Sequence, residues 1–207
     1  VEITGRVKAE TIYYIAEHID RYPGVTWHNK PIRRYLETGS IAHVLGYVND
    51  ITTEELQRLY NKGYSTGDVI GKRGIEREYD EILRGRDGAE YRTVDVTGRR
   101  VEAPDERIIP AVNGKDLVLT VDRHIQRLSE QALGERIGSV VVLKPATGEI
   151  LALVSYPSYD PNVFYEDRSG ERFKELSLDS RFPFLNRAIQ SGYAPASTFK
   201  IVMTTAL

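Results

Sequence analysis

The chain contains no cysteine among its 207 residues, which excludes disulfide bonds, cysteine-based zinc sites and catalysis by a thiol. It has no apolar run close to the roughly 18 residues that a membrane-spanning helix needs, and no signal-peptide pattern. The net charge of −2 predicts no general attraction to nucleic acid or to an anionic membrane surface. The absence of cysteine is compatible with an exported bacterial protein, and we expect any membrane anchor or export signal to lie outside this chain.

Histidine is also scarce, and its spacing does not match a metal site, whereas the order of residues alone is compatible with a Ser-His-Asp triad. No His-Glu-x-x-His pattern is present, and no Gly-x-Ser-x-Gly turn offers a nucleophile to a histidine base. We therefore expect no metal, no cofactor, and a structural or surface role for each histidine. The four histidines are His18, His28, His43 and His124.

What the sequence does contain is an ordinary globular composition, with 41% hydrophobic and 28% charged residues. The chain is long enough to bury a core. Residues 110–116, PAVNGKD, are the best linker candidate because proline, glycine and asparagine interrupt the periodic pattern. We predict an α+β fold in two parts, with a loop-rich mixed domain over residues 1–115 and a second domain of strands and helices over residues 116–207.

In the first domain, apolar spacing and turn residues predict short helices and strands. Thr52 and Glu55 have the spacing of a capping box, and Gly63 ends the helix that they begin. Thr97 and Gly98 predict the turn of a hairpin. The predicted elements are helices over 6–20, 52–63 and 75–85, a strand over 41–48 and a hairpin over 89–109.

In the second domain, LVLTVD (117–122) predicts a strand, and RHIQRLSEQAL (123–133) a helix. Ile125, Leu128 and Leu133 are expected on the inward face of that helix. SVVVLK and EILALVS are apolar strands separated by the tight turn PATG, which indicates an antiparallel hairpin covered on both faces. The final stretch, PASTFKIVMTTAL, predicts an apolar helix.

That final helix carries a serine and a lysine three residues apart, Ser197 and Lys200. This spacing places both side chains on one face, so that the amine can reach the hydroxyl. A serine needs a base to take its proton, and a lysine serves as that base only when its environment keeps it neutral. Serine and lysine together are one known solution to acyl transfer without histidine. Alternatively, Ser197 is a helix N-cap and Lys200 a surface residue of the first turn.

Several stretches resemble class B penicillin-binding proteins, in the order in which that family has them. KPATGEILALVSYPSYDPNVF followed by NRAIQSGYAPASTFK is similar to the start of the family's transpeptidase domain. Upstream, GKRGIEREYDEILRGRDG and LVLTVDRHIQRLSEQAL resemble the non-catalytic pedestal and its junction in the elongation-type enzymes, the penicillin-binding protein 2 group. A resemblance of this extent is more specific than any single motif.

The resemblance implies that Ser197 is the acylated nucleophile and Lys200 its proton acceptor. The implied reaction cross-links peptidoglycan: the serine attacks a stem peptide ending in D-Ala-D-Ala, and the acyl group passes to an amine of a neighbouring stem. β-Lactam antibiotics would acylate the same serine. The pedestal would contact a RodA-type glycosyltransferase and an MreC-type scaffold. The resemblance also implies a periplasmic location at the inner membrane, with an N-terminal transmembrane anchor outside this chain.

Two features depart from the family pattern. Ala194-Pro195-Ala196-Ser197 replaces the usual Pro-Pro-Gly-Ser, and PASTFKI is also similar to class D β-lactamases and related sensors. The family's Ser-x-Asn and Lys-Thr-Gly motifs are expected beyond Leu207, so we expect a truncated transpeptidase domain that is inactive alone. Two alternatives are a non-catalytic module that binds elongation partners and a class D-like β-lactamase or β-lactam sensor. A division-type enzyme is an alternative within the same family.

Overall fold

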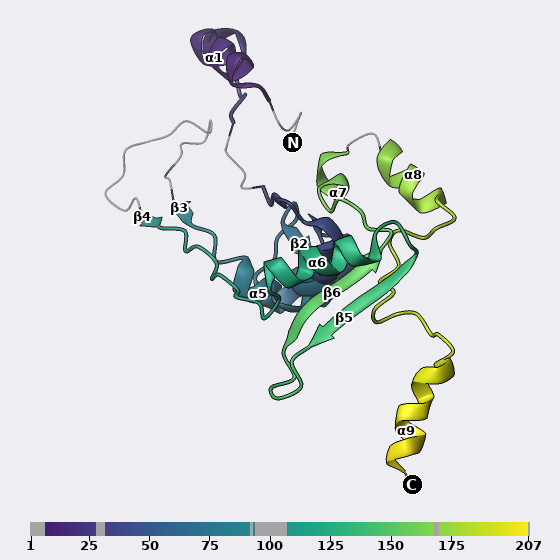
Figure 1. Cartoon of the computed structure of the whole chain (residues 1–207). Helices are drawn as coiled ribbons and strands as arrows, with labels where there is room; N and C mark the ends of the chain where they lie inside the picture. Colours follow the sequence, from purple (N-terminus) through teal and green to yellow (C-terminus); the bar gives the residue numbers. More distant parts are fainter. Residues whose placement is uncertain (1–6, 28–31, 92, 94–106, 168–169, 207) are drawn as a thin grey trace. The chain divides into compact units, whose positions relative to one another are not determined.

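The computed structural model describes residues 7–27, 32–91, 93, 107–167 and 170–206. The chain divides into two compact units, Val1–Arg34 and Tyr35–Leu207. The described part of the first unit holds helix α1, Ala9–Glu17, followed by the short 3₁₀ turn η1, Ile19–Arg21 (Figure 1). The helix predicted over residues 6–20 is therefore confirmed, with α1 as its regular part.

The second unit combines short helices with three two-stranded antiparallel sheets in its described residues, which confirms the predicted α+β class (Figure 1). Its first elements are η2 Gly39–Ile41, α2 Ala42–Leu45, β1 Val48–Asp50, α3 Thr53–Arg58, η3 Tyr60–Lys62, β2 Val69–Gly71, α4 Gly74–Glu78, α5 Asp80–Leu83, β3 Ala89–Tyr91 and β4 Arg107–Ile109. Its later elements are α6 Arg123–Leu133, β5 Gly138–Leu143, β6 Ile150–Tyr156, α7 Val163–Glu166, α8 Glu171–Leu178, η4 Ala196–Thr198 and α9 Phe199–Thr205.

The strand predicted over residues 41–48 is wrong, because most of this stretch is helical. The turn η2 runs into α2, which ends at Gly46, where the backbone adopts a φ of 77°. A short apolar run does not distinguish a buried helix from a buried strand, and here Ala42 is completely buried. The strand β1 begins only at Val48 and pairs with β2, so that Val48 lies opposite Gly71.

The predicted helix start at Thr52 is confirmed as a complete capping box. The hydroxyl of Thr52 accepts from the Glu55 amide at 3.3 Å, and the Glu55 carboxylate accepts from the Thr52 amide at 2.9 Å. The helix predicted over 75–85 is also present, interrupted at Tyr79 between α4 and α5. The strands of the 89–109 hairpin pair as β3 and β4, whereas its predicted turn at Thr97 and Gly98 lies outside the described residues.

The predicted linker, residues 110–116, is held by backbone hydrogen bonds to the chain around α5. Arg86 and Val112 exchange two bonds of 2.8 and 2.9 Å, and the Lys115 amide donates to Ile82 O at 2.9 Å. A side chain on Gly114 would lie 2.0 Å from Leu83 O, so only glycine allows this close approach. The segment is thus tied down through its backbone, although every residue in it except Gly114 is exposed.

Residues 117–122 do not form the predicted strand, because they run along the edge of β6 without a regular ladder. The hydroxyl of Thr120 donates to Ile150 O at 2.8 Å, and the Asp122 amide donates to Leu151 O at 2.9 Å. These bonds satisfy carbonyl groups on the side of β6 that faces away from β5. Asp122 then caps α6 through the amides of His124 and Ile125.

The predicted hairpin of β5 and β6 is confirmed, with Val140 opposite Val154. The two strands differ in burial, which corrects the expectation that both would be covered on both faces. Four successive residues of β6, from Ala152 to Ser155, are buried. In contrast, Val141 and Leu143 of β5 are exposed, so this strand has an uncovered apolar side.

The helix α6 packs on β6 (Figure 1). Of the apolar residues predicted to face inward, Ile125 and Leu133 are half-buried. Leu128 is 50% exposed and does not face inward as predicted, whereas Gln126 is 5% exposed. The Gln126 amide donates to Leu153 O at 3.1 Å and accepts from Leu153 N at 2.9 Å, like a neighbouring strand. A buried strand edge needs partners for its backbone groups, so a polar side chain occupies this position.

Candidate active site

Ser197 and Lys200 lie in the stretch where the turn η4 leads into α9. Every described residue from Gly192 to Ala206 is exposed. The apolar side chains of α9, namely Phe199, Ile201, Val202 and Met203, are between 51% and 73% exposed. The helix is therefore present as predicted, but it is not buried beyond its first turn in this chain.

The backbone before α9 makes a sharp entry into the helix. Ala196 has a φ of 45°, in the left-handed region that residues with a side chain rarely adopt. The Thr198 amide donates to Pro195 O at 3.0 Å, and the Thr198 hydroxyl donates to the same carbonyl. No side-chain cap is formed by Ser197 at the start of η4 or α9. Thr198 thus closes the turn, and the alternative that Ser197 acts only as an N-cap has no support in these contacts.

Ser197 and Lys200 are brought together by their sequence spacing, since residues three apart share one side of a helical turn. The structure describes both residues, and the Ser197 hydroxyl and the Lys200 amine are not hydrogen-bonded to each other. Lys200 O accepts from the Thr204 hydroxyl at 2.7 Å, and Thr205 bonds to Ile201 O at 2.6 Å in the same way. The polar side chains further along α9 are thus satisfied within the helix, while Ser197 and Lys200 are open to solvent.

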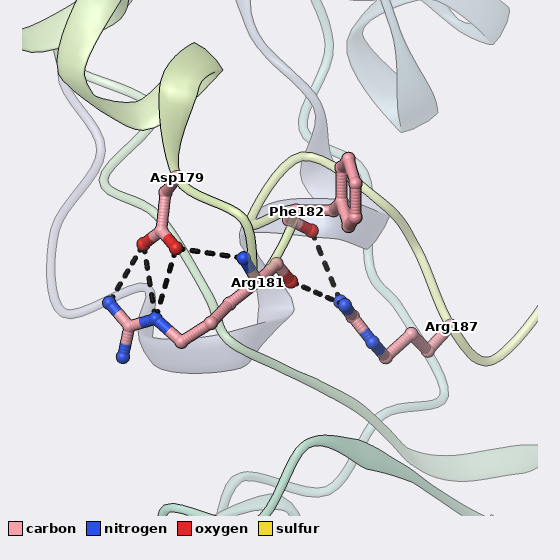
Figure 2. A network of polar contacts seen from close by, with 4 residues as sticks. All are labelled: Asp179, Arg181, Phe182 and Arg187. Atoms are coloured by element: carbon pink, nitrogen blue, oxygen red, sulfur yellow. Dashed lines mark hydrogen bonds and ion pairs between the residues drawn. The ribbon is translucent and has the colours of Figure 1, made fainter.

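Polar contacts that sequence reasoning missed hold the turn between α8 and the exposed segment that begins at Gly192 (Figure 2). The guanidinium of Arg187 donates to the main-chain carbonyl groups of Arg181, Phe182 and Leu185. On the outside of the turn, Arg181 pairs with Asp179, with Nη2 and Oδ2 2.7 Å apart. This pairing lowers the pKa of the Asp179 carboxyl, mainly through its hydrogen bonds to Arg181.

His43 reaches the same turn from α2 and is buried, in agreement with the structural role expected for it. Its Nε2 lies 2.7 Å from Pro183 O, and its Nδ1 lies 3.4 Å from Ser40 O. Burial lowers the pKa of this imidazole, while its hydrogen bonds to the carbonyl groups of Pro183 and Ser40 oppose that shift. The ring of Tyr159 meets that of His43 edge to face, at 5.0 Å between centroids.

The contact between His43 and Pro183 joins two regions of the second unit, residues 35–47 and residues 123–184. Other contacts join the same two regions. The Asn162 side chain bonds to both backbone groups of Tyr35 at 2.9 Å, and the rings of Tyr47 and Phe164 stack. A carboxylate oxygen of Glu130 accepts from the Ser40 amide at 2.9 Å and from its hydroxyl at 2.6 Å. Gln126 Nε2 also donates to Ser40 Oγ at 2.9 Å. We refer to these contacts, together with those of His43, as the junction.

The described residues meet the requirements of neither a metal centre nor a membrane-spanning helix. No group of three or more metal-binding side chains occurs in the part of the chain that the structure describes. Within the same residues, no helix is both long and apolar enough to cross a lipid bilayer. His28 lies outside the described residues, and His124 is exposed on α6.

Two family models match the chain in succession. The model of the penicillin-binding protein dimerisation domain matches residues 1–119, and that of the penicillin-binding protein transpeptidase domain matches residues 138–207. The chain therefore belongs to the penicillin-binding protein family. The second match contains both Ser197 and Lys200, and the first covers the part expected to be the pedestal.

Within the family, the resemblance to the penicillin-binding protein 2 group is confirmed. The peptidoglycan D,D-transpeptidase MrdA of Escherichia coli K12 is 40% identical over 184 residues, which are 87% of this chain and 29% of MrdA. The protein in the crystal structure of Pseudomonas aeruginosa PBP2 in complex with WCK 5153 has 33% sequence identity to this chain. The two structures have a TM-score of 0.63, and the match covers 81% of this chain and 33% of that chain.

A third comparison concerns the fold alone, because the sequence identity is only 24%. The complex between PBP2 and MreC from Helicobacter pylori has a TM-score of 0.77 and covers 97% of this chain and 37% of that chain. The chain thus spans only about a third of the length of these proteins, from 29% to 37%. Its short antiparallel sheets and helices match the pedestal and the beginning of the transpeptidase domain.

Proposed function

We propose that the whole protein is an elongation-type peptidoglycan D,D-transpeptidase, in which residues 1–115 form the pedestal and residues 116–207 begin the catalytic domain. One observation carries the proposal: Ser197 of η4 and Lys200 of α9, three residues apart, lie inside the transpeptidase match and downstream of the dimerisation match. The 40% identity to MrdA over most of the chain supports the same reaction.

In the proposed reaction, Lys200 Nζ accepts the proton of the Ser197 hydroxyl while Ser197 Oγ attacks the carbonyl carbon of the D-Ala-D-Ala bond. The amide bond breaks, the terminal D-Ala leaves as an amine with a proton, and an ester joins the remaining stem peptide to Ser197. The amine of a second stem then attacks this ester, which restores the serine and forms the cross-link. A β-lactam enters at the first step, because its ring amide opens on the same oxygen.

The 207-residue chain is proposed to be inactive by itself, and its sheet supports this view. The edge of β6 that faces away from β5 is occupied by Thr120, Asp122 and Gln126. Among the described residues, no strand pairs with the other edge of β5. We infer that the rest of the catalytic sheet adds beside β5, and that the exposed apolar residues of β5 and α9 are covered in the whole protein.

The partners and the location follow the same family assignment. We propose peptidoglycan stem peptides as substrates and β-lactams as inhibitors, and we place the pedestal against an MreC-type scaffold and a RodA-type glycosyltransferase. The solved PBP2 and MreC complex from Helicobacter pylori supports the scaffold contact. The proposed location is the periplasmic face of the inner membrane, with an N-terminal anchor.

The proposal is tested by labelling the whole protein with a fluorescent penicillin and resolving it on a denaturing gel. Ser197→Ala is expected to abolish the label, because no other oxygen occupies the position of the nucleophile. Ser191→Ala, which changes a serine six residues earlier in the same segment, is expected to label like the unaltered protein. A label that persists on Ser197→Ala would contradict the assignment of the nucleophile.

A further inference from the structure

The turn of residues 179–187 directs several main-chain carbonyl groups towards buried side chains. Arg187 Nη1 donates to Phe182 O at 3.1 Å, and its Nη2 donates to Arg181 O (Figure 2). Arg187 Nη1 also donates to Leu185 O at 3.4 Å. The intervening carbonyl of Pro183 accepts from His43 Nε2 at 2.7 Å. Two buried side chains therefore hold four carbonyl groups of one short turn.

Arg187 is an unusual residue for this task because its side chain carries a full charge and is almost entirely buried. The residue is only 6% exposed, and all three hydrogen bonds described for its guanidinium end on main-chain oxygens. A planar fork of donors can hold several acceptors in fixed directions, which an ammonium or an amide does less well. This arrangement defines the shape of a turn, including Phe182, whose φ of 51° is left-handed.

The backbone of Arg187 is fixed as firmly as its side chain. Its amide donates to Ser155 Oγ at 3.0 Å, and the same hydroxyl donates to Leu185 O at 3.1 Å. Ser155 is completely buried in β6. Among the hydrogen bonds of the described residues, those of Arg187 with Ser155 and Ser139 are the last that bind the chain to the hairpin before it continues, through residues 188–196, to Ser197.

We propose that Arg187 is a positioning residue for the acylation of Ser197, acting through the turn of residues 179–187. This inference rests on the proposed function, in which Ser197 is the acylated nucleophile. A nucleophile reacts efficiently only when it is held within roughly 3–3.5 Å of its target in the correct direction. The turn sets the point and the direction from which the segment carrying Ser197 leaves the sheet. Loss of the guanidinium would let that segment shift.

The test measures the time course of acylation of the whole protein at saturating fluorescent penicillin. The first-order rate constant reports how well Ser197 is placed in each folded molecule, while the final labelled fraction reports how many molecules are folded. Arg187→Gln is expected to lower the rate constant by about 10- to 100-fold, because a displacement of about 1 Å has effects of that size. The penicillin concentration at half-maximal rate is expected to change little.

Arg181→Gln is the matched control, because it removes the exposed guanidinium on the other side of the same turn and keeps the carbonyl that Arg187 binds. It is expected to leave the rate constant unchanged. Ser155→Ala is a milder second variant, in case Arg187→Gln fails to fold, and is expected to lower the rate constant several-fold. An unchanged rate constant in the folded fraction of Arg187→Gln, or in Ser155→Ala if the first variant does not fold, would overturn the inference.

The same assay separates this inference from the proposed function. If Ser197→Ala still takes up label, the assignment of Ser197 fails, and the positioning role of Arg187 fails with it. If Ser197→Ala is unlabelled while Arg187→Gln reacts at the normal rate, only the positioning role fails. A slow Arg187→Gln together with an unlabelled Ser197→Ala supports both.

Discussion

The junction and the segment of residues 192–206 differ in what holds them in place. In the junction, Ser40, Gln126 and His43 are buried and bonded to partners far away in the sequence. In the C-terminal segment, the residues with recognisable chemistry, Ser197 and Lys200, are exposed together with all their neighbours. The junction is therefore determined by packing within this chain, whereas the candidate site is determined by a local pattern of residues.

This difference teaches that a reactive motif and its supporting structure can come from separate parts of a protein. A short helical turn is sufficient to place a serine beside a lysine. It is not sufficient to lower the polarity around the lysine or to fix the serine against a substrate, because both require surrounding atoms. The junction has such surroundings, because its polar side chains are buried and hydrogen-bonded to distant parts of the chain.

The largest expected effect comes from a substitution that forces α2, which carries His43 of the junction, away from α4. Gly46 ends α2 at a φ of 77°, and a side chain there would lie 1.8 Å from Arg73 O. Gly46→Ala is expected to lower the free energy of unfolding of this chain by more than about 3 kcal/mol, because backbone of α2 and α4 must separate. Urea denaturation followed by circular dichroism measures the loss.

Gly148→Ala is the control for this effect. Gly148 also has a left-handed φ of 76°, but no atom lies within 4 Å of the added carbon. The expected cost is only the conformational one, about 1 kcal/mol. Equal losses for the two glycines would show that the close contact between α2 and α4 contributes nothing.

A pair of identical substitutions tests the comparison most directly. Val154 of β6 is 1% exposed, and Val202 of α9 is 58% exposed. Val154→Ala is expected to cost about 2–3 kcal/mol of the free energy of unfolding, because it removes two buried carbons and leaves a cavity. Val202→Ala is expected to cost less than about 0.5 kcal/mol in this chain. Similar losses at both positions, measured in urea, would mean that α9 is packed as tightly as β6.

The smallest expected effect is the pH dependence contributed by His43. Burial lowers the pKa of His43 in the folded chain, so the unfolded chain binds a proton at a higher pH than the folded chain does. The free energy of unfolding should therefore fall as the pH drops below about 6.5, the ordinary value for histidine, by at most about 1.4 kcal/mol per pH unit. Urea denaturation at a series of pH values between 7.5 and 5.5, roughly the range around that ordinary value, measures the slope.

His43→Gln should reduce this pH dependence, because the glutamine amide can still donate to Pro183 O but cannot titrate. His124→Gln removes an exposed histidine from α6 and is expected to retain the slope of the unaltered chain. If His43→Gln and the unaltered chain show the same slope, the pH dependence arises from other groups.

The parts of the fold that sequence reasoning predicted are those whose causes are local. The capping box of Thr52 and Glu55 needs residues three apart, and the hairpin of β5 and β6 needs two apolar runs around a short turn. Ser197 and Lys200 were likewise singled out because three residues separate them. Their roles stay a prediction.

The parts that it missed depend on partners that are distant in the sequence. Asn162 bonds to Tyr35 across 127 positions, and Gln126 is buried because it meets the backbone of Leu153. No periodic pattern distinguishes that glutamine from the exposed Leu128 two positions later, and the apolar spacing favoured the leucine. The role of Arg187 was missed for the same reason, since its acceptors are main-chain carbonyl groups, which every residue has.

The amide of Gln126 has a further consequence for how the sheet can be assembled. An unpaired strand edge is a template for any extended segment, including a strand in the wrong order or one from another molecule. By imitating a strand partner at Leu153, Gln126 closes one part of this edge, and Thr120 and Asp122 close the part beside it. Any further strand is then directed to the side of β5, so these three residues give the sheet a direction of assembly and protect its finished edge against misfolding and aggregation.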